Sequence, residues 1–298
     1  MLHFSDPHVG LGLWRVPLRD WPGKRLAGAV NLLRGRGRRF RDALPALAGL
    51  ARLASREGAD AAVCTGDLSA LGTDAELEAA RAAVDPFFQL PLGFVCLPGN
   101  HDLYTASVLR EQRFERWFGE GLATDLPALR SDGAWPLVRF LGDAAAVVAV
   151  NSARPNPLPW RSSGRVPDGQ LEGLRAALAR ADVRDRFVLV ATHYAPLRAD
   201  GKPDAPLHGM DNAPAFLDAC AGVRRGMILC GHIHHPFRWR AAGLAAEVLC
   251  AGSATLEVRR AAWWIEVGPD GAEIRPVRPA TPARDEWEIG PAGAPSPS

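Results

Sequence analysis

Short apolar runs alternate with longer amphipathic segments along most of the chain. The short runs contain four to seven residues rich in Val, Leu, Ile and aromatic side chains, and Gly, Asp or Pro bounds them. This pattern is typical of strands that are buried on both faces. We expect strands at Leu2–Ser5, Ala61–Thr65, Gly93–Leu97, Ala145–Asn151, Phe187–Thr192, Met227–Cys230, Glu247–Ala251 and Ala261–Val267. We expect helices at Ala43–Glu57, Asp74–Val84 and Gln170–Ala181.

The alternation of strands and helices predicts a layered α/β architecture with a largely parallel component. From Phe187 onward the intervening helices are shorter or missing, so we expect a mixed sheet there. One domain over residues 1–275 accounts for these elements. The tail, residues 276–298, is rich in Pro, Ala, Gly and Ser, and we expect it to be poorly ordered.

The first connection, residues 11–41, is a long insertion where a few residues would normally suffice. Leu26, Ala29, Val30 and Leu33 follow helical spacing and give one apolar face. Nine basic residues against one acid between Arg15 and Arg41 give this part a charge of +8. The net charge of the whole chain is +2, so the remainder carries −6. The positive charge is therefore concentrated in the insertion.

The bulk properties are those of a globular enzyme. The 298 residues are 47% hydrophobic and 23% charged. No apolar stretch is long enough for a membrane span, and the strand-like start predicts no secretory signal. Five cysteines without a CxxC pair predict reduced core thiols and a cytoplasmic location.

Five short polar signatures follow the predicted strands in order. They are Asp6-Pro7-His8, Gly66-Asp67, Gly99-Asn100-His101-Asp102, Thr192-His193 and Gly231-His232-Ile233-His234, and they contain five of the eight histidines. The ends of parallel strands converge at one edge of an α/β sheet, so we expect these side chains to meet. Imidazole and carboxylate ligands suit first-row divalent metals, and the absence of motif cysteines disfavours a structural zinc site.

With these five signatures in this order, the chain resembles the calcineurin-like metallophosphoesterases over roughly residues 2–268. The resemblance implies a two-sheet α/β/β/α sandwich with mixed sheets and flanking helices. It also implies an enzyme, a binuclear metal-dependent phosphodiesterase-like hydrolase that cleaves a phosphodiester or a pyrophosphate through a metal-bridging hydroxide. Two cations about 4 Å apart clamp the phosphoryl oxygens and activate water.

The resemblance also assigns roles to individual residues. Asp6, His8 and His234 would bind one metal ion, Asn100, His193 and His232 the other, and Asp67 would bridge the two. His101 would protonate the leaving group, with Asp102 orienting its ring. Manganese, iron, zinc or cobalt would suit these ligands, and we favour manganese.

The substrate stays open between several alternatives. Candidate substrate contacts are Asn100, His208, Arg15 and Arg19. Cyclic nucleotides and glycerophosphodiesters fit one branch of the family, whereas the basic, Trp-bearing segment 14–41 suits contact with anionic lipid at the inner membrane face. That contact favours a lipid-linked nucleotide pyrophosphatase of the UDP-diacylglucosamine type. We expect no nucleic-acid partner because the total charge is modest. In a different class, the chain would be a noncatalytic, partner-binding scaffold of the same fold, but its complete ligand set favours the enzyme.

Overall fold

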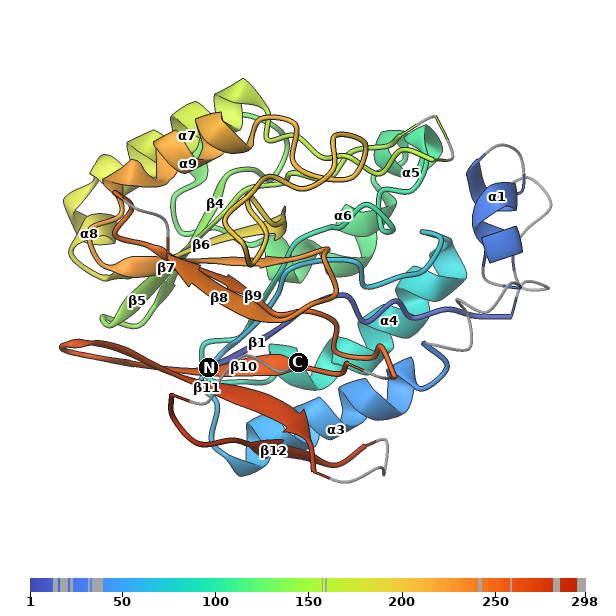
Figure 1. Cartoon of the computed structure of the whole chain (residues 1–298), viewed down its shortest axis with the longest axis horizontal. Helices are drawn as coiled ribbons and strands as arrows, with labels where there is room; N and C mark the ends of the chain where they lie inside the picture. Colours follow the sequence, from blue (N-terminus) through green and yellow to red (C-terminus); the bar gives the residue numbers. More distant parts are fainter. Residues whose placement is uncertain are drawn as a thin grey trace.

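The computed structural model describes residues 1–12, 16, 21, 24–31, 33, 40–156, 158, 160–240, 243–257, 259–280 and 285–293. Within these ranges the chain forms two sheets that lie face to face, with helices on the outer side of each (Figure 1). This is the mixed, two-sheet α/β sandwich that the resemblance implies. No helix in the described ranges has the length and apolar character that a membrane crossing requires.

The first sheet has the described strand order β12-β11-β10-β1-β2-β3. Its strands are β1 (Leu2–Phe4), β2 (Ala62–Cys64), β3 (Phe94–Cys96), β10 (Ala262–Gly268), β11 (Gly271–Pro279) and β12 (Trp287–Ile289). The strands β1, β2 and β3 are parallel, whereas β10, β11 and β12 pair in antiparallel fashion. Helices α3 (Ala43–Arg56) and α4 (Asp74–Phe88) cover the outer face (Figure 1).

The second sheet has the described order β4-β5-β6-β7-β9-β8. Its strands are β4 (Leu137–Leu141), β5 (Ala145–Ala149), β6 (Phe187–Tyr194), β7 (Gly226–Gly231), β8 (Phe237–Arg240) and β9 (Glu247–Cys250). β5, β6, β7 and β9 are parallel, and β4 and β8 are antiparallel edge strands. Helices α7 (Asp168–Ala179), α8 (Ala181–Arg184) and α9 (Ala213–Ala219) cover its outer face (Figure 1).

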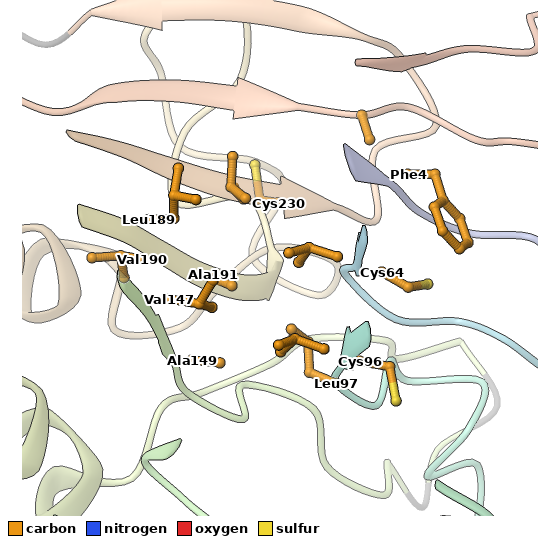
Figure 2. Close-up of a cluster of buried hydrophobic side chains, with 14 of the residues drawn as sticks. Phe4, Cys64, Cys96, Leu97, Val147, Ala149, Leu189, Val190, Ala191 and Cys230 are labelled. Atoms are coloured by element: carbon orange, nitrogen blue, oxygen red, sulfur yellow. The ribbon is translucent and has the colours of Figure 1, made fainter. Parts of the chain in front are cut away.

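The core lies between the two sheets. Phe4 and Cys64 from the first sheet and Leu189 and Cys230 from the second are all fully buried (Figure 2). The Phe4 ring packs on Phe87 of α4, with 5.0 Å between the ring centroids. All five cysteines are buried free thiols, which confirms the expected reduced core cysteines. This apolar layer fixes the position of the two sheets relative to each other. Their strand ends therefore lie at a common edge of the sandwich.

Smaller helices complete the described structure. They are α1 (Lys24–Asn31), α5 (Ala106–Arg110), α6 (Arg113–Phe118) and the short 3₁₀ turns η4 (Gly119–Leu122), η5 (Pro127–Leu129) and η6 (Cys220–Gly222). Helix α1 carries the apolar face expected in the insertion and lies at the edge of the molecule (Figure 1).

The expectation of a poorly ordered tail from residue 276 was wrong for most of that segment. Strand β11 continues to Pro279, and β12 pairs with it. The Trp287 side chain is buried and donates a hydrogen bond of 3.1 Å from Nε1 to the carbonyl of Ala46 in α3. A long-range aromatic anchor therefore holds residues 285–289, although the local composition is typical of disorder. Residues 281–284 and 294–298 lie outside the described residues.

Candidate metal centre

The polar signatures meet at one edge of the sandwich because every one of them ends or follows a parallel strand. β1, β2 and β3 deliver Asp6, His8, Asp67 and Asn100, whereas β6 and β7 deliver His193, His232 and His234. Each sheet thus supplies part of one cluster, and we call these seven residues the ligand cluster.

The backbone of the ligand cluster is strained. Six non-glycine residues in the described ranges have positive φ, and five of them belong to the cluster: Asp6 (52°), His8 (46°), Asp67 (55°), His232 (67°) and His234 (56°). Asp, Asn and His tolerate this left-handed region better than other residues, but each such residue still costs free energy and clusters at functional sites. The hydroxyls of Ser253 and Thr255, which local sequence does not identify, donate to the carbonyls of Asp6 and Pro7 at 2.8 Å and 2.6 Å.

The glycines of the signatures are required by close packing. A Cβ at Gly99 would overlap the Asp67 carboxylate, and one at Gly231 would overlap the side chains of Ser5 and Asp6. At Gly66, where φ is +103°, a Cβ would lie 2.8 Å from Nδ1 of His193. Any side chain larger than hydrogen at these three positions would push the ligand residues apart, so close approach of the ligands requires glycine there.

Four of these residues form a compact group of donors: Asp6, His8, Asp67 and His234. Nε2 of His234 lies 2.8 Å from Nε2 of His8 and 3.0 Å from Oδ1 of Asp6. Nε2 of His8 lies 3.7 Å from Oδ2 of Asp67. Imidazole nitrogens and carboxylate oxygens at these distances fit a first-row divalent cation.

A second group of donors shares Asp67. Nε2 of His193 lies 3.2 Å from Oδ1 of Asn100 and 3.6 Å from Oδ2 of Asp67. The other ring nitrogen of His193 donates to the Thr65 carbonyl at 2.7 Å, which leaves Nε2 as the ligand atom. Asp67 therefore lies between the two groups.

His232 completes the second group with its other nitrogen. Its Nε2 donates to the carbonyl of His208 at 3.0 Å, so Nδ1 is free to bind a metal. Its ring lies 5.2 Å from the ring of His193. Burial lowers the pKa of His193 and lowers that of His232 further, which keeps both rings in the neutral form that metals require.

His101 lies directly beside the ligand cluster. Its ring meets the ring of His8 edge-on at 4.7 Å, and its main-chain N–H donates to Oδ1 of Asp67 at 2.7 Å. Nδ1 donates to the carbonyl of Ala70 at 2.6 Å, so Nε2 is the nitrogen that can exchange a proton with a substrate. On its other side the ring stacks on Tyr104 at 5.4 Å, a contact that the sequence does not reveal.

The expectation that Asp102 orients the His101 ring is corrected by the structure. The Asp102 carboxylate accepts hydrogen bonds from the main-chain N–H groups of Leu68, Ser69 and Gly99, and from the Ser69 hydroxyl. Burial raises the pKa of this carboxyl to about 6, although these donors act in the opposite direction. Asp102 thus fastens the third signature to the second, and the Ala70 carbonyl orients His101.

The other candidate substrate contacts differ in their status. His208 is half exposed; its ring stacks against His232 at 4.2 Å, and its Nδ1 lies 2.5 Å from Asp204. Arg15 and Arg19 lie outside the described residues. We call helix α1 together with residues 160–164 and 204–211 the rim of the site.

Two basic residues of helix α1 fasten it to the edge that holds the ligand cluster. Sequence patterns do not distinguish these two from the other cations of the insertion. The buried Arg25 donates to the carbonyls of Leu71 and Gly72 at 3.1 Å and 2.9 Å. Nζ of Lys24 donates to the carbonyl of Arg161 at 3.2 Å and lies 4.9 Å from the centre of the Tyr104 ring. The insertion therefore contacts Tyr104, the residue that stacks on His101.

Comparison with known proteins identifies a family and a fold. The family model described as calcineurin-like phosphoesterase matches residues 1–236. No curated protein matches the chain. Among solved structures, a dimetal phosphatase from Danio rerio is similar with a TM-score of 0.63 at 15% identity, over 97% of each chain. A purple acid phosphatase from yellow lupin (Lupinus luteus) seeds has a TM-score of 0.52 at 11% identity, over 93% of this chain and 48% of its own. At these identities the two structures show the fold.

Proposed function

The chain belongs to the calcineurin-like phosphoesterase family and is a metal-dependent phosphoester hydrolase. From this premise we propose that it cleaves a phosphodiester or a pyrophosphate with two divalent ions, manganese being favoured. The observation that carries the proposal is the position of Asp67, whose Oδ2 lies 3.7 Å from His8 and 3.6 Å from His193. One carboxylate between two donor groups is what a binuclear centre needs.

The residues present fit such a centre. Asp6, His8 and His234 would hold one ion, Asn100, His193 and His232 the other, and Asp67 both. Two bound divalent ions supply charge neutralisation at the phosphoryl oxygens and lower the pKa of water toward neutrality.

The residues around the centre orient the substrate and move the proton. Because Nδ1 of His101 donates to the Ala70 carbonyl, Nε2 is the nitrogen left for the substrate. When the ring carries a second proton, on Nε2, it would transfer that proton to a departing alkoxide. The Asn100 amide and the half-exposed His208 ring border the same edge and would contact the substrate. Arg15 and Arg19 remain predicted substrate contacts.

The test is metal-dependent turnover of bis-p-nitrophenyl phosphate. Protein stripped with a chelator should be inactive, and manganese should restore activity while two ions per chain are taken up. Protein that binds two ions but hydrolyses no phosphodiester or pyrophosphate would instead support the noncatalytic, partner-binding alternative. Zinc, iron and cobalt added in parallel would identify the metal that sustains the highest kcat.

A second candidate function is hydrolysis of a lipid-linked nucleotide pyrophosphate at the inner membrane face. Three apolar side chains of the insertion are exposed: Leu26 (57%), Val30 (38%) and Leu33 (75%). Trp160 and Leu207, in the other two rim segments, are exposed by 67% and 50%. Apolar side chains beside a basic segment suit an anionic bilayer surface.

Vesicle sedimentation tests this candidate. Replacement of Leu26, Val30 and Leu33 by Asn should release the protein from vesicles that contain phosphatidylglycerol. Leu44→Asn is the matched control, since Leu44 is 45% exposed on α3 outside the rim. Equal sedimentation of the triple variant and the control would reject membrane contact through segment 14–41.

A further inference from the structure

Three basic side chains converge on residues 160–164 of the rim. Arg154 and Arg161 both bind the Asp211 carboxylate, with Arg161 at 3.0 Å, and both contact the Ser163 hydroxyl, at 3.2 Å and 2.8 Å. Lys24 joins them through the Arg161 carbonyl. These contacts tie the insertion to two loops that are distant in sequence.

This group carries more positive charge than its internal pairing needs. Two guanidinium groups share one carboxylate, and Lys24 adds a third cation against the single anion of Asp211. The side chains of Arg154 and Arg161 are 34% and 35% exposed, so their remaining N–H donors can reach a ligand. Arginine presents a planar fork of donors that matches phosphate oxygens.

We call Lys24, Arg154 and Arg161 the cationic group; it borders the ligand cluster on two sides. The hydroxyl of Tyr194 donates to the Ser162 carbonyl, and the Tyr194 ring lies 4.1 Å from the ring of His232. On the other side, Lys24 lies over Tyr104, which stacks on His101. Burial lowers the pKa of Lys24 to about 8, while the negative charge of Asp67 acts in the opposite direction, so the ammonium group interacts with the metal edge.

We propose that Lys24, Arg154 and Arg161 form a subsite for a second phosphoryl group of the substrate, separate from the one that is hydrolysed. This inference rests on the proposed phosphoesterase function and narrows its substrate class to nucleotides or similar esters with more than one phosphoryl group. The ligand cluster takes the scissile phosphoryl group, and the three cations neutralise the other. Such a subsite lowers KM for the doubly phosphorylated substrate and leaves the chemistry unchanged.

A matched pair of chromogenic esters tests the subsite. Thymidine 5′-(p-nitrophenyl phosphate) and its 3′-phosphorylated form have the same scissile bond and leaving group and differ by one phosphate. With the manganese enzyme, KM should be at least about tenfold lower for the 3′-phosphorylated ester, as a pair of charge-assisted hydrogen bonds would give. This advantage should shrink about tenfold in Arg161→Gln, Arg154→Gln and Lys24→Met, while kcat on either ester stays within about twofold.

Two further variants separate anion binding from a structural role. Arg165→Gln is the matched control, because Arg165 lies in the same stretch but pairs with Asp168 at 2.8 Å. Asp211→Asn should lower KM for the 3′-phosphorylated ester, since it removes the competing carboxylate; a folded variant with unchanged or higher KM would count against the subsite. Wild-type enzyme that hydrolyses both esters with equal KM, or Arg variants that keep the preference, would overturn the inference. Failure of the metal-loaded enzyme to hydrolyse these esters, bis-p-nitrophenyl phosphate or a nucleotide pyrophosphate would instead overturn the proposed function.

Discussion

The ligand cluster and the rim lie at the same edge of the sandwich but differ in burial. Asp6 closely follows β1 and His193 lies within β6, and both side chains are fully buried. Trp160 and Arg161 lie on a long connection and are 67% and 35% exposed. A buried set of ligands can serve one reaction at phosphorus, whereas exposed side chains on long loops can change with the substrate. We therefore infer that the ligand cluster determines the reaction and the rim determines the specificity.

The largest effect should come from the carboxylate shared by the two donor groups. Asp67→Asn removes the negative charge between them, and we expect kcat on bis-p-nitrophenyl phosphate to fall by well over about 100-fold, more than outer-sphere partners usually cost. Metal analysis should show fewer than two ions per chain. Asp168→Asn, at an exposed ion pair away from the cluster, is the control and should behave as wild type. An active Asp67→Asn variant with full metal content would contradict the inference that the ligand cluster, and not the rim, determines the reaction.

A smaller loss, restricted to poor leaving groups, should follow the removal of His101. His101→Ala should lower kcat on a glycerophosphodiester by about 100-fold or more, because the departing alkoxide loses its proton donor. The loss on bis-p-nitrophenyl phosphate should be much smaller, since p-nitrophenolate leaves without a proton. Metal content should be unchanged. Equal losses on both esters would mean that His101 acts through the ligand cluster instead.

Gly28 offers a way to test whether the rim and the centre are mechanically independent. Gly to Ala inside a helix normally stabilises by about 0.5–1 kcal/mol. At Gly28 a Cβ would overlap the Tyr104 hydroxyl and lie 2.8 Å from Leu71, so Tyr104 must shift beneath His101. We expect Gly28→Ala to lower kcat by roughly threefold to tenfold, about 1 kcal/mol in the barrier, with unchanged metal content. Gly119→Ala, where a Cβ meets nothing within 4 Å, is the control.

The last effect concerns the free energy of unfolding instead of catalysis, and it involves Glu76, which supports the connection next to the rim. Burial raises the pKa of Glu76 to about 7, although its Oε2 accepts the N–H groups of Leu71 and Thr73 at 2.9 Å and 3.3 Å. Because the folded state holds this proton more tightly than the unfolded state, its stabilisation is complete below about pH 4.5 and is lost as pH rises toward 7. We therefore measure the free energy of unfolding by urea at pH 5 and at pH 8. Between these two pH values the wild type should lose up to about 3 kcal/mol more of this free energy than Glu76→Gln does. A pH-independent difference would show that Glu76 has an ordinary pKa.

The sequence predicts the parts of the molecule that are determined locally. Apolar runs and their bounding polar residues give the central strands, and parallel strand ends explain why residues as distant as Asp6 and His234 meet. The prediction of a poorly ordered tail failed because Trp287 is buried against α3. No local sequence pattern specifies that contact. Likewise the partners of Asp102 are main-chain donors that become available only once two loops have met. Lys24 looks like any other cation of the insertion until the Arg161 carbonyl and the Tyr104 ring are beside it.

The positive φ angles of five ligand residues determine when the centre is formed. Each left-handed, non-glycine residue costs about 1–3 kcal/mol, so together they oppose folding by several kcal/mol. The packing of the two sheets, which buries Asp6, His8, Asp67 and His232, can offset such a cost without an ion. The metal-free protein should consequently already hold its donors in place, and an arriving ion must adapt to the protein. Which metal binds then depends on two properties of each ion. One is its intrinsic affinity for these ligands, and the other is how closely its preferred coordination geometry matches the positions of the donors.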